Sequence, residues 1–193
     1  MKRLLLALSF ASLAVTASGC AAETASTDPN DQVATEDVSA ATDAKVKTAI
    51  EKTTKGVSFL SESDHTLDWI STATVPTTAT NAAFVHRYFN AVTNGDSQAD
   101  KPLSSLHSET VDFEKFAGTF VAVKGEDPDN YAYHQQMTKV LSSVRSHIKN
   151  PVVIRMGKKD ASGPWLEGAI SVYIIGTLPS GKVGGLFTVS VET

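Results

Sequence analysis

The clearest alternation of apolar and polar residues lies in the last third of the chain. Three stretches there are rich in β-branched and aromatic side chains, which is typical of strands. They span residues 151–156, 168–176 and 183–193. In the second stretch Ile174 lies between Tyr173 and Ile175, so both faces of that strand should be buried. We expect the last two strands to pair as a hairpin across residues 177–183.

Helical spacing of apolar residues occurs in four stretches. We predict helices over residues 43–56 and 80–94, a short helix capped by Asp112, and the longest helix starting at Asp127-Pro128. An Asp at the N-cap and a Pro in the first helical position are both favourable at a helix start. The apolar stripe of this longest helix consists of Met137, Val140, Leu141, Val144 and Ile148.

Shorter segments lie between these elements. Residues 57–60 and 67–73 have the pattern of short strands, and residues 94–108 have the composition of a polar loop. Because helices occur both before and between the strands, the pattern predicts an α+β layered domain.

The first twenty residues have the three parts of a secretory signal peptide. Lys2 and Arg3 precede an apolar run, residues 4–15, which is too short to span a membrane. The following Ala17-Ser18-Gly19-Cys20 resembles a bacterial lipobox, which implies cleavage before Cys20 and lipid attachment to it. The alternative is an ordinary signal peptide with a chance cysteine.

These features divide the chain into three parts. Residues 1–19 are the predicted lipoprotein signal peptide. Residues 20–44 begin with the lipidated Cys20 and continue with an acidic segment that lacks basic and aromatic side chains, so we expect a disordered tether. Residues 45–193 have the length of one domain.

The charge balance argues against nucleic-acid binding. The chain has 17 basic and 21 acidic residues, a formal charge of −4, and removing Lys2 and Arg3 gives 15 − 21 = −6. Nucleic acids require clustered positive charge, whereas an acidic surface suits a partner with a basic site. With one Cys the chain can form no internal disulfide, so core burial alone must stabilise the domain.

No sequence motif indicates an enzyme or a cofactor of its own. Residues 176–182 match most of the Walker A spacing, but Val183 replaces the Ser or Thr that holds Mg²⁺, and a strand pattern follows. We therefore expect a hairpin turn. The five histidines lack the i, i+4 spacing of a helical zinc site, and no G-x-S-x-G nucleophile motif occurs.

Two segments of the chain resemble the nuclease A inhibitor family, small proteins that block a sugar-non-specific DNA/RNA endonuclease. They are GVSFLSESD (56–64) and IKNPVVIRMG…ISVYIIGTLPSGKVGGLFTVSVET (148–193), with a weaker match at VDFEKF (111–116). The likeness covers roughly residues 45–193. It implies an α/β/α sandwich in which helices cover both faces of a central mixed, mostly antiparallel sheet.

The resemblance also implies a mechanism of inhibition. Glu62, flanked by Ser61 and Ser63, would enter the nuclease active site in place of the scissile phosphate. The Glu192-Thr193 end would bring an oxygen of Thr193 to the catalytic Mg²⁺ of the nuclease, so the metal would be bridged only in the complex. The alternatives are that Glu62 is an ordinary exposed carboxylate and that Thr193 is a frayed end.

One departure from the family concerns a second contact. Family inhibitors can carry an adjacent Asp-Trp before the long helix, but the corresponding residues 123–133 contain no Trp. The candidates for this contact here are Glu126, Asp127, Asp129 and Tyr131.

The leading hypothesis is a nuclease inhibitor, monomeric when free, exported and lipid-anchored to the bacterial cell envelope. Its partners would be a DNA/RNA non-specific endonuclease and, through the lipid, a membrane, without direct contact to nucleic acid. A second hypothesis keeps the fold but has the lipoprotein bind another protein or a ligand, which the missing Trp favours. A third is an envelope hydrolase with a dispersed site.

Overall fold

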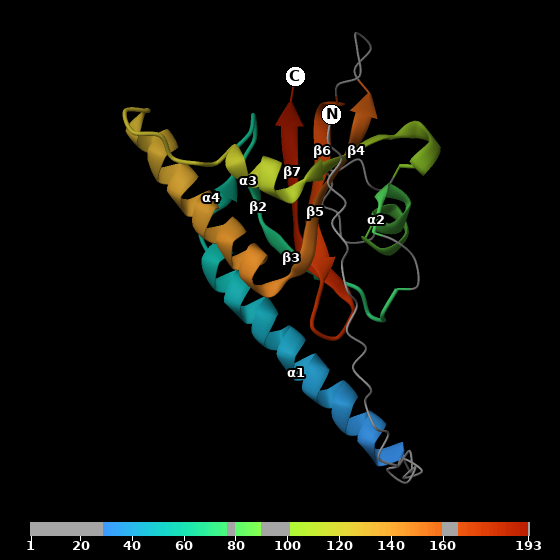
Figure 1. The fold of residues 1–193 in the computed structure, drawn as a ribbon. Helices are drawn as coiled ribbons and strands as arrows, with labels where there is room; N and C mark the ends of the chain where they lie inside the picture. The colour runs from blue at the N-terminus through green and yellow to red at the C-terminus, as the bar shows by residue number, and fades with distance from the viewer. Residues whose placement is uncertain (1–28, 77–79, 90–100, 160–165, 193) are drawn as a thin grey trace, which may run out of the picture.

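The computed structural model describes residues 29–76, 80–89, 101–159 and 166–192 (Figure 1). Its centre is a five-stranded sheet in the order β3-β7-β6-β5-β4. The strands are β3 (Asp68–Ser71), β4 (His107–Asp112), β5 (Lys149–Lys159), β6 (Leu166–Thr177) and β7 (Val183–Glu192). Every neighbouring pair of strands is antiparallel. The predicted α+β class is confirmed, but the sheet is fully antiparallel and the predicted mixed character is wrong. Antiparallel pairing follows because β5, β6 and β7 form a meander with short reversals.

Helices cover both faces of the sheet, as predicted (Figure 1). On one face lie α1 (Pro29–Thr54), α3 (Phe113–Gly118) and α4 (Pro128–His147), and on the other lies α2 (Ala82–Phe89). Leu141 of α4 packs in one core with Ile174, and Phe89 of α2 packs in the other with Tyr173. Burying each such side chain contributes about 1.5–3 kcal/mol.

Strand β6 is buried on both faces, as its alternation predicts. Ile170, Val172 and Ile174 face the core beneath α1 and α4, whereas Tyr173 and Ile175 face the core beneath α2. The strand therefore separates the two cores and forms the middle of the sheet.

Strand β7 passes between β3 and β6 and requires a glycine at position 185. Gly185 has a φ of +155°, and a Cβ atom there would collide with the carbonyl oxygen of Ile174 on β6. The Gly184-Gly185 pair therefore allows β7 to approach both of its neighbours closely.

Helix α1 begins earlier than predicted, at Pro29 instead of Asp43. It therefore includes part of the segment expected to be a disordered tether, and with 26 residues it, not the 20-residue α4, is the longest described helix. Pro suits a helix start, and the Ala, Glu and Gln residues that follow favour helix without an apolar face. Val46 and Ile50 of α1 belong to the core beneath α1 and α4. None of the helices in the described ranges has the length and hydropathy that crossing a bilayer would require.

The segment predicted as a polar loop ends in strand β4, which the sequence pattern missed. Its residues alternate between half-buried and exposed positions along the edge of the sheet. Edge strands commonly carry polar residues, so their hydrophobic alternation is weak. The two predicted short strands correspond to β1 (Ser58–Phe59) and β3, and β1 pairs with β2 (His65–Thr66).

The stretch with partial Walker A spacing forms the predicted turn between β6 and β7. The Leu178 amide donates to the Lys182 carbonyl, and Gly181 takes a φ of +84°. Ser180 donates through both its amide and its hydroxyl to the Asp43 carboxylate of α1. The turn is thus attached to α1 at Asp43.

Candidate functional site

The predicted phosphate-mimicking residue lies in the hairpin loop Leu60–Asp64 between β1 and β2. Within the loop, the Ser61 hydroxyl donates to the Ser63 carbonyl at 2.7 Å, and the Ser63 hydroxyl lies 3.1 Å from Nε2 of His65. Phe59, just before the loop, is buried against Phe116 and Phe120. These contacts fix both the base of the loop and its internal shape, while the Glu62 side chain is exposed.

The same loop is hydrogen-bonded to the end of β7. The Glu62 amide donates to the Val191 carbonyl at 3.2 Å, and the Val191 amide donates to the Ser61 hydroxyl at 3.0 Å. This edge of β7 is available because the pairing with β3 reaches only as far as Phe187. The structure therefore brings Ser61, Glu62 and Glu192 together, although they are far apart in the sequence.

An open groove of about 460 Å³ lies between the loop and the end of β7. Its apolar lining includes Leu60, Phe120 and Tyr133, and Glu62 and Glu192 line it as well. The Tyr133 hydroxyl accepts a hydrogen bond from the Leu60 amide at 3.2 Å. Burial raises the pKa of Tyr133, while this hydrogen bond opposes the rise.

Glu192 is held by polar groups of its own sheet. Its Oε1 atom accepts from the Arg155 guanidinium and from the Ser190 hydroxyl. The other terminal nitrogen of Arg155, Nη1, binds Glu109 at 3.0 Å. The sequence analysis missed Arg155 because nothing in a strand sequence shows which cross-strand residues will form ion pairs.

The candidates for a second contact divide into two kinds. The side chains of Glu126 and Asp127 have structural partners: Glu126 binds His134 at 3.0 Å and the Val123 amide, and Asp127 caps α4 through the Asp129 amide. Asp129 and Tyr131 are both exposed, and 39% of the surface of Tyr131 is accessible.

Two exposed valines near this segment were not predicted. Val121 and Val123 are 59% and 61% accessible and precede α4. The loop that carries them is held by the Glu126–His134 pair and by the Thr138 hydroxyl, which donates to the Phe120 carbonyl at 2.9 Å. Since Phe120 also lines the groove, this apolar loop adjoins the candidate site.

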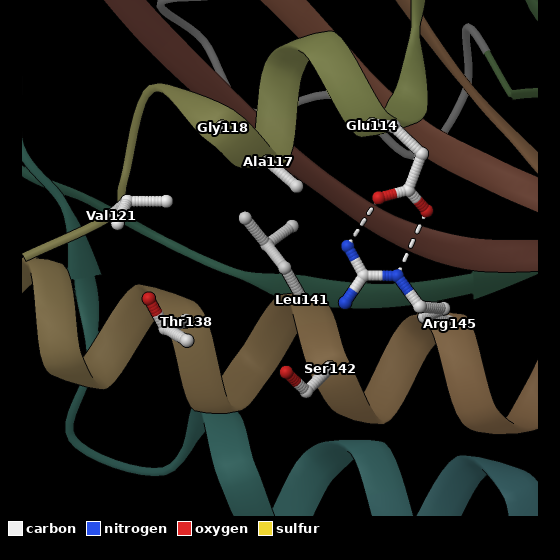
Figure 2. Close-up of a pocket in the computed structure, with 8 residues that line it drawn as sticks. All are labelled: Glu114, Ala117, Gly118, Val121, Thr138, Leu141, Ser142 and Arg145. Atoms are coloured by element: carbon white, nitrogen blue, oxygen red, sulfur yellow. Dashed lines mark hydrogen bonds and ion pairs between the residues drawn. The ribbon is translucent and has the colours of Figure 1, made fainter.

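A second hollow, of about 250 Å³, lies between α3 and α4 (Figure 2). Ala117 and Leu141 approach each other across it, and a pair formed by Glu114 and Arg145 closes one end (Figure 2). The hydrogen bond from Arg145 lowers the pKa of Glu114. No cluster of His, Cys, Asp and Glu in the described ranges could hold a metal ion.

Two residues of the predicted site lie outside the described ranges. They are Cys20, the predicted lipidation site, and Thr193, the predicted ligand to the metal of the nuclease. Their roles stay predictions.

The family assignment follows from the whole domain. No curated protein matches the chain at a significant level. The sequence does match the family described as Nuclease A inhibitor-like protein, over residues 44–193. That span contains all five strands of the central sheet and the loop that carries Glu62. The chain therefore belongs to the nuclease A inhibitor-like family.

Proposed function

We propose that the protein inhibits a DNA/RNA non-specific endonuclease by inserting the rim of the groove into its active site. Family membership supports the inhibitory role. The single observation that supports the specific site is the pair of hydrogen bonds joining Glu62 and Ser61 to Val191. Because of these bonds, two segments with acidic residues form one rigid edge, and preorganised edges bind with a smaller entropic cost.

In this proposal the Glu62 carboxylate replaces the scissile phosphate. Nucleases bind that phosphate with basic side chains and a divalent cation, and a carboxylate can accept the same charge-assisted hydrogen bonds. The exposed side chain of Glu62 stands on a loop whose backbone is already fixed, so its position would change little on binding.

The metal of the complex would belong to the nuclease. Thr193, which follows Glu192 in the sequence, would supply an oxygen to the catalytic Mg²⁺, a hard cation that prefers oxygen ligands. Ser61 and Ser63 would support the loop and not contact the metal.

We further propose that Tyr131, Val121 and Val123 replace the aromatic second contact of the family. All three are accessible, and Val121 directly follows the groove residue Phe120 in the sequence. Apolar and aromatic anchors commonly dominate the energy of an interface. Glu126 and Asp127 would then act indirectly, by shaping the loop and the start of α4.

The lipid proposed for Cys20 would hold the inhibitor at the cell envelope, where an exported nuclease acts. Cys20→Ala should move the protein from the membrane fraction to the soluble fraction. Retention in the membrane fraction would contradict lipid anchoring and leave the inhibitory site unaffected.

The inhibitory site is tested by titrating the purified protein into a DNA-cleavage assay with a DNA/RNA non-specific endonuclease of the same organism and Mg²⁺. Glu62→Ala should raise the inhibition constant about 100-fold, since it removes a charged group from a buried contact. Addition of three glycines after Thr193 should also weaken inhibition, because the terminus could no longer reach the metal.

Glu51→Ala is the matched control, since Glu51 is an exposed carboxylate of α1 that pairs with Lys47. It should inhibit like the wild type. If the wild type inhibits and both site variants remain equally potent, the proposed site is wrong. If the wild type inhibits no such nuclease, the role of an envelope lipoprotein that binds another partner gains support.

A further inference from the structure

We propose that Arg155 is a positioning residue of the inhibitory site: it fixes the end of β7 against the loop that carries Glu62. This inference rests on the proposed function for its effect on a nuclease, but its effect on the groove can be measured in the free protein. Arg155 lies on β5, two strands away from β7.

The geometry of Arg155 connects three strands. Its guanidinium binds Glu109 on the neighbouring strand β4 and Glu192 beyond β6. The register places Arg155 opposite both Glu109 and Val172, so the side chain lies on the same face of the sheet as the groove. The β6 residue opposite Glu192 is Gly168, which has no side chain to occupy the space beside that carboxylate.

The end of β7 is thereby held from two sides. On one side the loop forms its two hydrogen bonds to Val191, and on the other Arg155 and the Ser190 hydroxyl share one oxygen of Glu192. These contacts act on Val191 and Glu192, the last two residues of β7. Without Arg155, Glu109 and Glu192 would be neighbouring carboxylates with no cation between them. Their repulsion would move the end of β7 out of position.

Arg155 is better suited to positioning than to direct contact with a partner. Only 23% of its side chain is accessible, and both of its terminal nitrogens already bind carboxylates. Arg145 is the natural control because it also pairs with a glutamate, but its side chain is 47% accessible and joins α3 to α4, away from the groove.

The first test is amide hydrogen exchange in the free protein. In Arg155→Gln, the amides of Glu62 and Val191 should exchange about 10-fold faster, because the bonds that they donate, to the Val191 carbonyl and the Ser61 hydroxyl, would open more often. Amides of Leu186–Thr188, in the middle of β7, should keep their rates. A general loss of stability would instead accelerate all of these amides together. The inference is overturned if Glu62 and Val191 exchange no faster in Arg155→Gln than in Arg145→Gln.

The second test is a double-mutant cycle on inhibition. Arg155→Gln and Glu192→Gln should each weaken inhibition about 10-fold, and the double variant should be no weaker than the worse single variant. Effects that multiply to about 100-fold would mean that Arg155 contacts the nuclease itself, which overturns the positioning role. If the wild type inhibits no nuclease, the proposed function fails, while the exchange experiment still decides whether Arg155 fixes the groove.

Discussion

Two hollows on the same side of the sheet are each lined by a glutamate that pairs with an arginine, in two different settings. At the groove beside Glu62, Glu192 pairs with Arg155, whose side chain is 23% accessible and binds carboxylates from β4 and β7. In the hollow between α3 and α4, Arg145 and Glu114 are both exposed and join only two helices (Figure 2). The comparison teaches that an ion pair near the surface matters mainly through the segments that it connects, since the pair itself contributes at most about 1 kcal/mol.

The backbone beneath the two hollows also differs. The groove is built on the end of β7, which pairs with β6 on one edge and is hydrogen-bonded to the Glu62 loop on the other, whereas the hollow is built on α3, a short helix at the surface. The first region should therefore tolerate very few changes and the second many. Three pairs of variants and one single variant test this contrast, from the largest expected effect to the smallest.

The largest contrast concerns two glycines. Gly185→Ala should cost about 3 kcal/mol or more, because its Cβ would collide with the β6 backbone at a position whose φ is already unfavourable for alanine. Gly118→Ala, beside the α3–α4 hollow, should change stability by less than about 0.5 kcal/mol, since nothing lies near its Cβ. Urea unfolding measures both. Equal costs would break the comparison.

A smaller effect is expected for Tyr133→Phe, which removes the acceptor for the Leu60 amide. The loss should be about 1 kcal/mol at neutral pH. Burial raises the pKa of Tyr133 above its ordinary value of 10.0 in the folded state. The unfolded state therefore loses this proton first, and the wild type should lose stability as the pH rises above about 10.

Tyr133→Phe should show a shallower decline of stability above that pH than the wild type. Tyr131→Phe is the control, because Tyr131 is exposed and lies on the same helix, α4. It should follow the wild-type curve. Identical alkaline slopes for Tyr133→Phe and the wild type would refute the assigned role of burial.

Two threonines should respond with opposite signs. The Thr188 hydroxyl, on β7, is buried without a hydrogen-bond partner among the described residues, so Thr188→Val should stabilise the protein by up to about 1 kcal/mol. Thr138 lines the α3–α4 hollow, and its hydroxyl donates to Phe120, so Thr138→Val should destabilise by about 1 kcal/mol. Thermal unfolding decides the signs, and a stabilised Thr138→Val would contradict the account.

The smallest effect is expected at Glu114. The hydrogen bond from Arg145 lowers the pKa of Glu114, so its contribution is present above the ordinary value of 4.5 and is lost as the pH falls. Because the pair is exposed, Glu114→Gln should leave the urea midpoint nearly unchanged at neutral pH, and the two proteins should converge further in acid. A large loss at neutral pH would mean that the pair is more than a surface contact.

Much of the fold could be predicted from local sequence. The alternation in β6, the caps at Asp112 and Asp127 and the apolar stripe of α4 all report burial or helix ends directly, and the structure confirms them. Strand β4 could not be found in this way, because an edge strand is polar and short. The early start of α1 was missed because the sequence there has no regular apolar stripe of the kind that predicts a helix.

The candidate site was predictable only where a motif exists. The likeness of FLSES drew attention to Glu62, and the structure places that loop beside Glu192. Arg155 and the exposed valines belong to no motif, and their significance depends on strand register and on which side chains remain uncovered. Both properties are set by tertiary structure.

The bond between Asp43 and Ser180 has a mechanical consequence. It joins α1 to the turn between β6 and β7, two long strands of the sheet. A pull along α1 would therefore be transmitted to the middle of the sheet and not only to the helix. Long hydrogen-bonded strands share such a load over many bonds, so the paired strands β6 and β7 should separate late under such a pull.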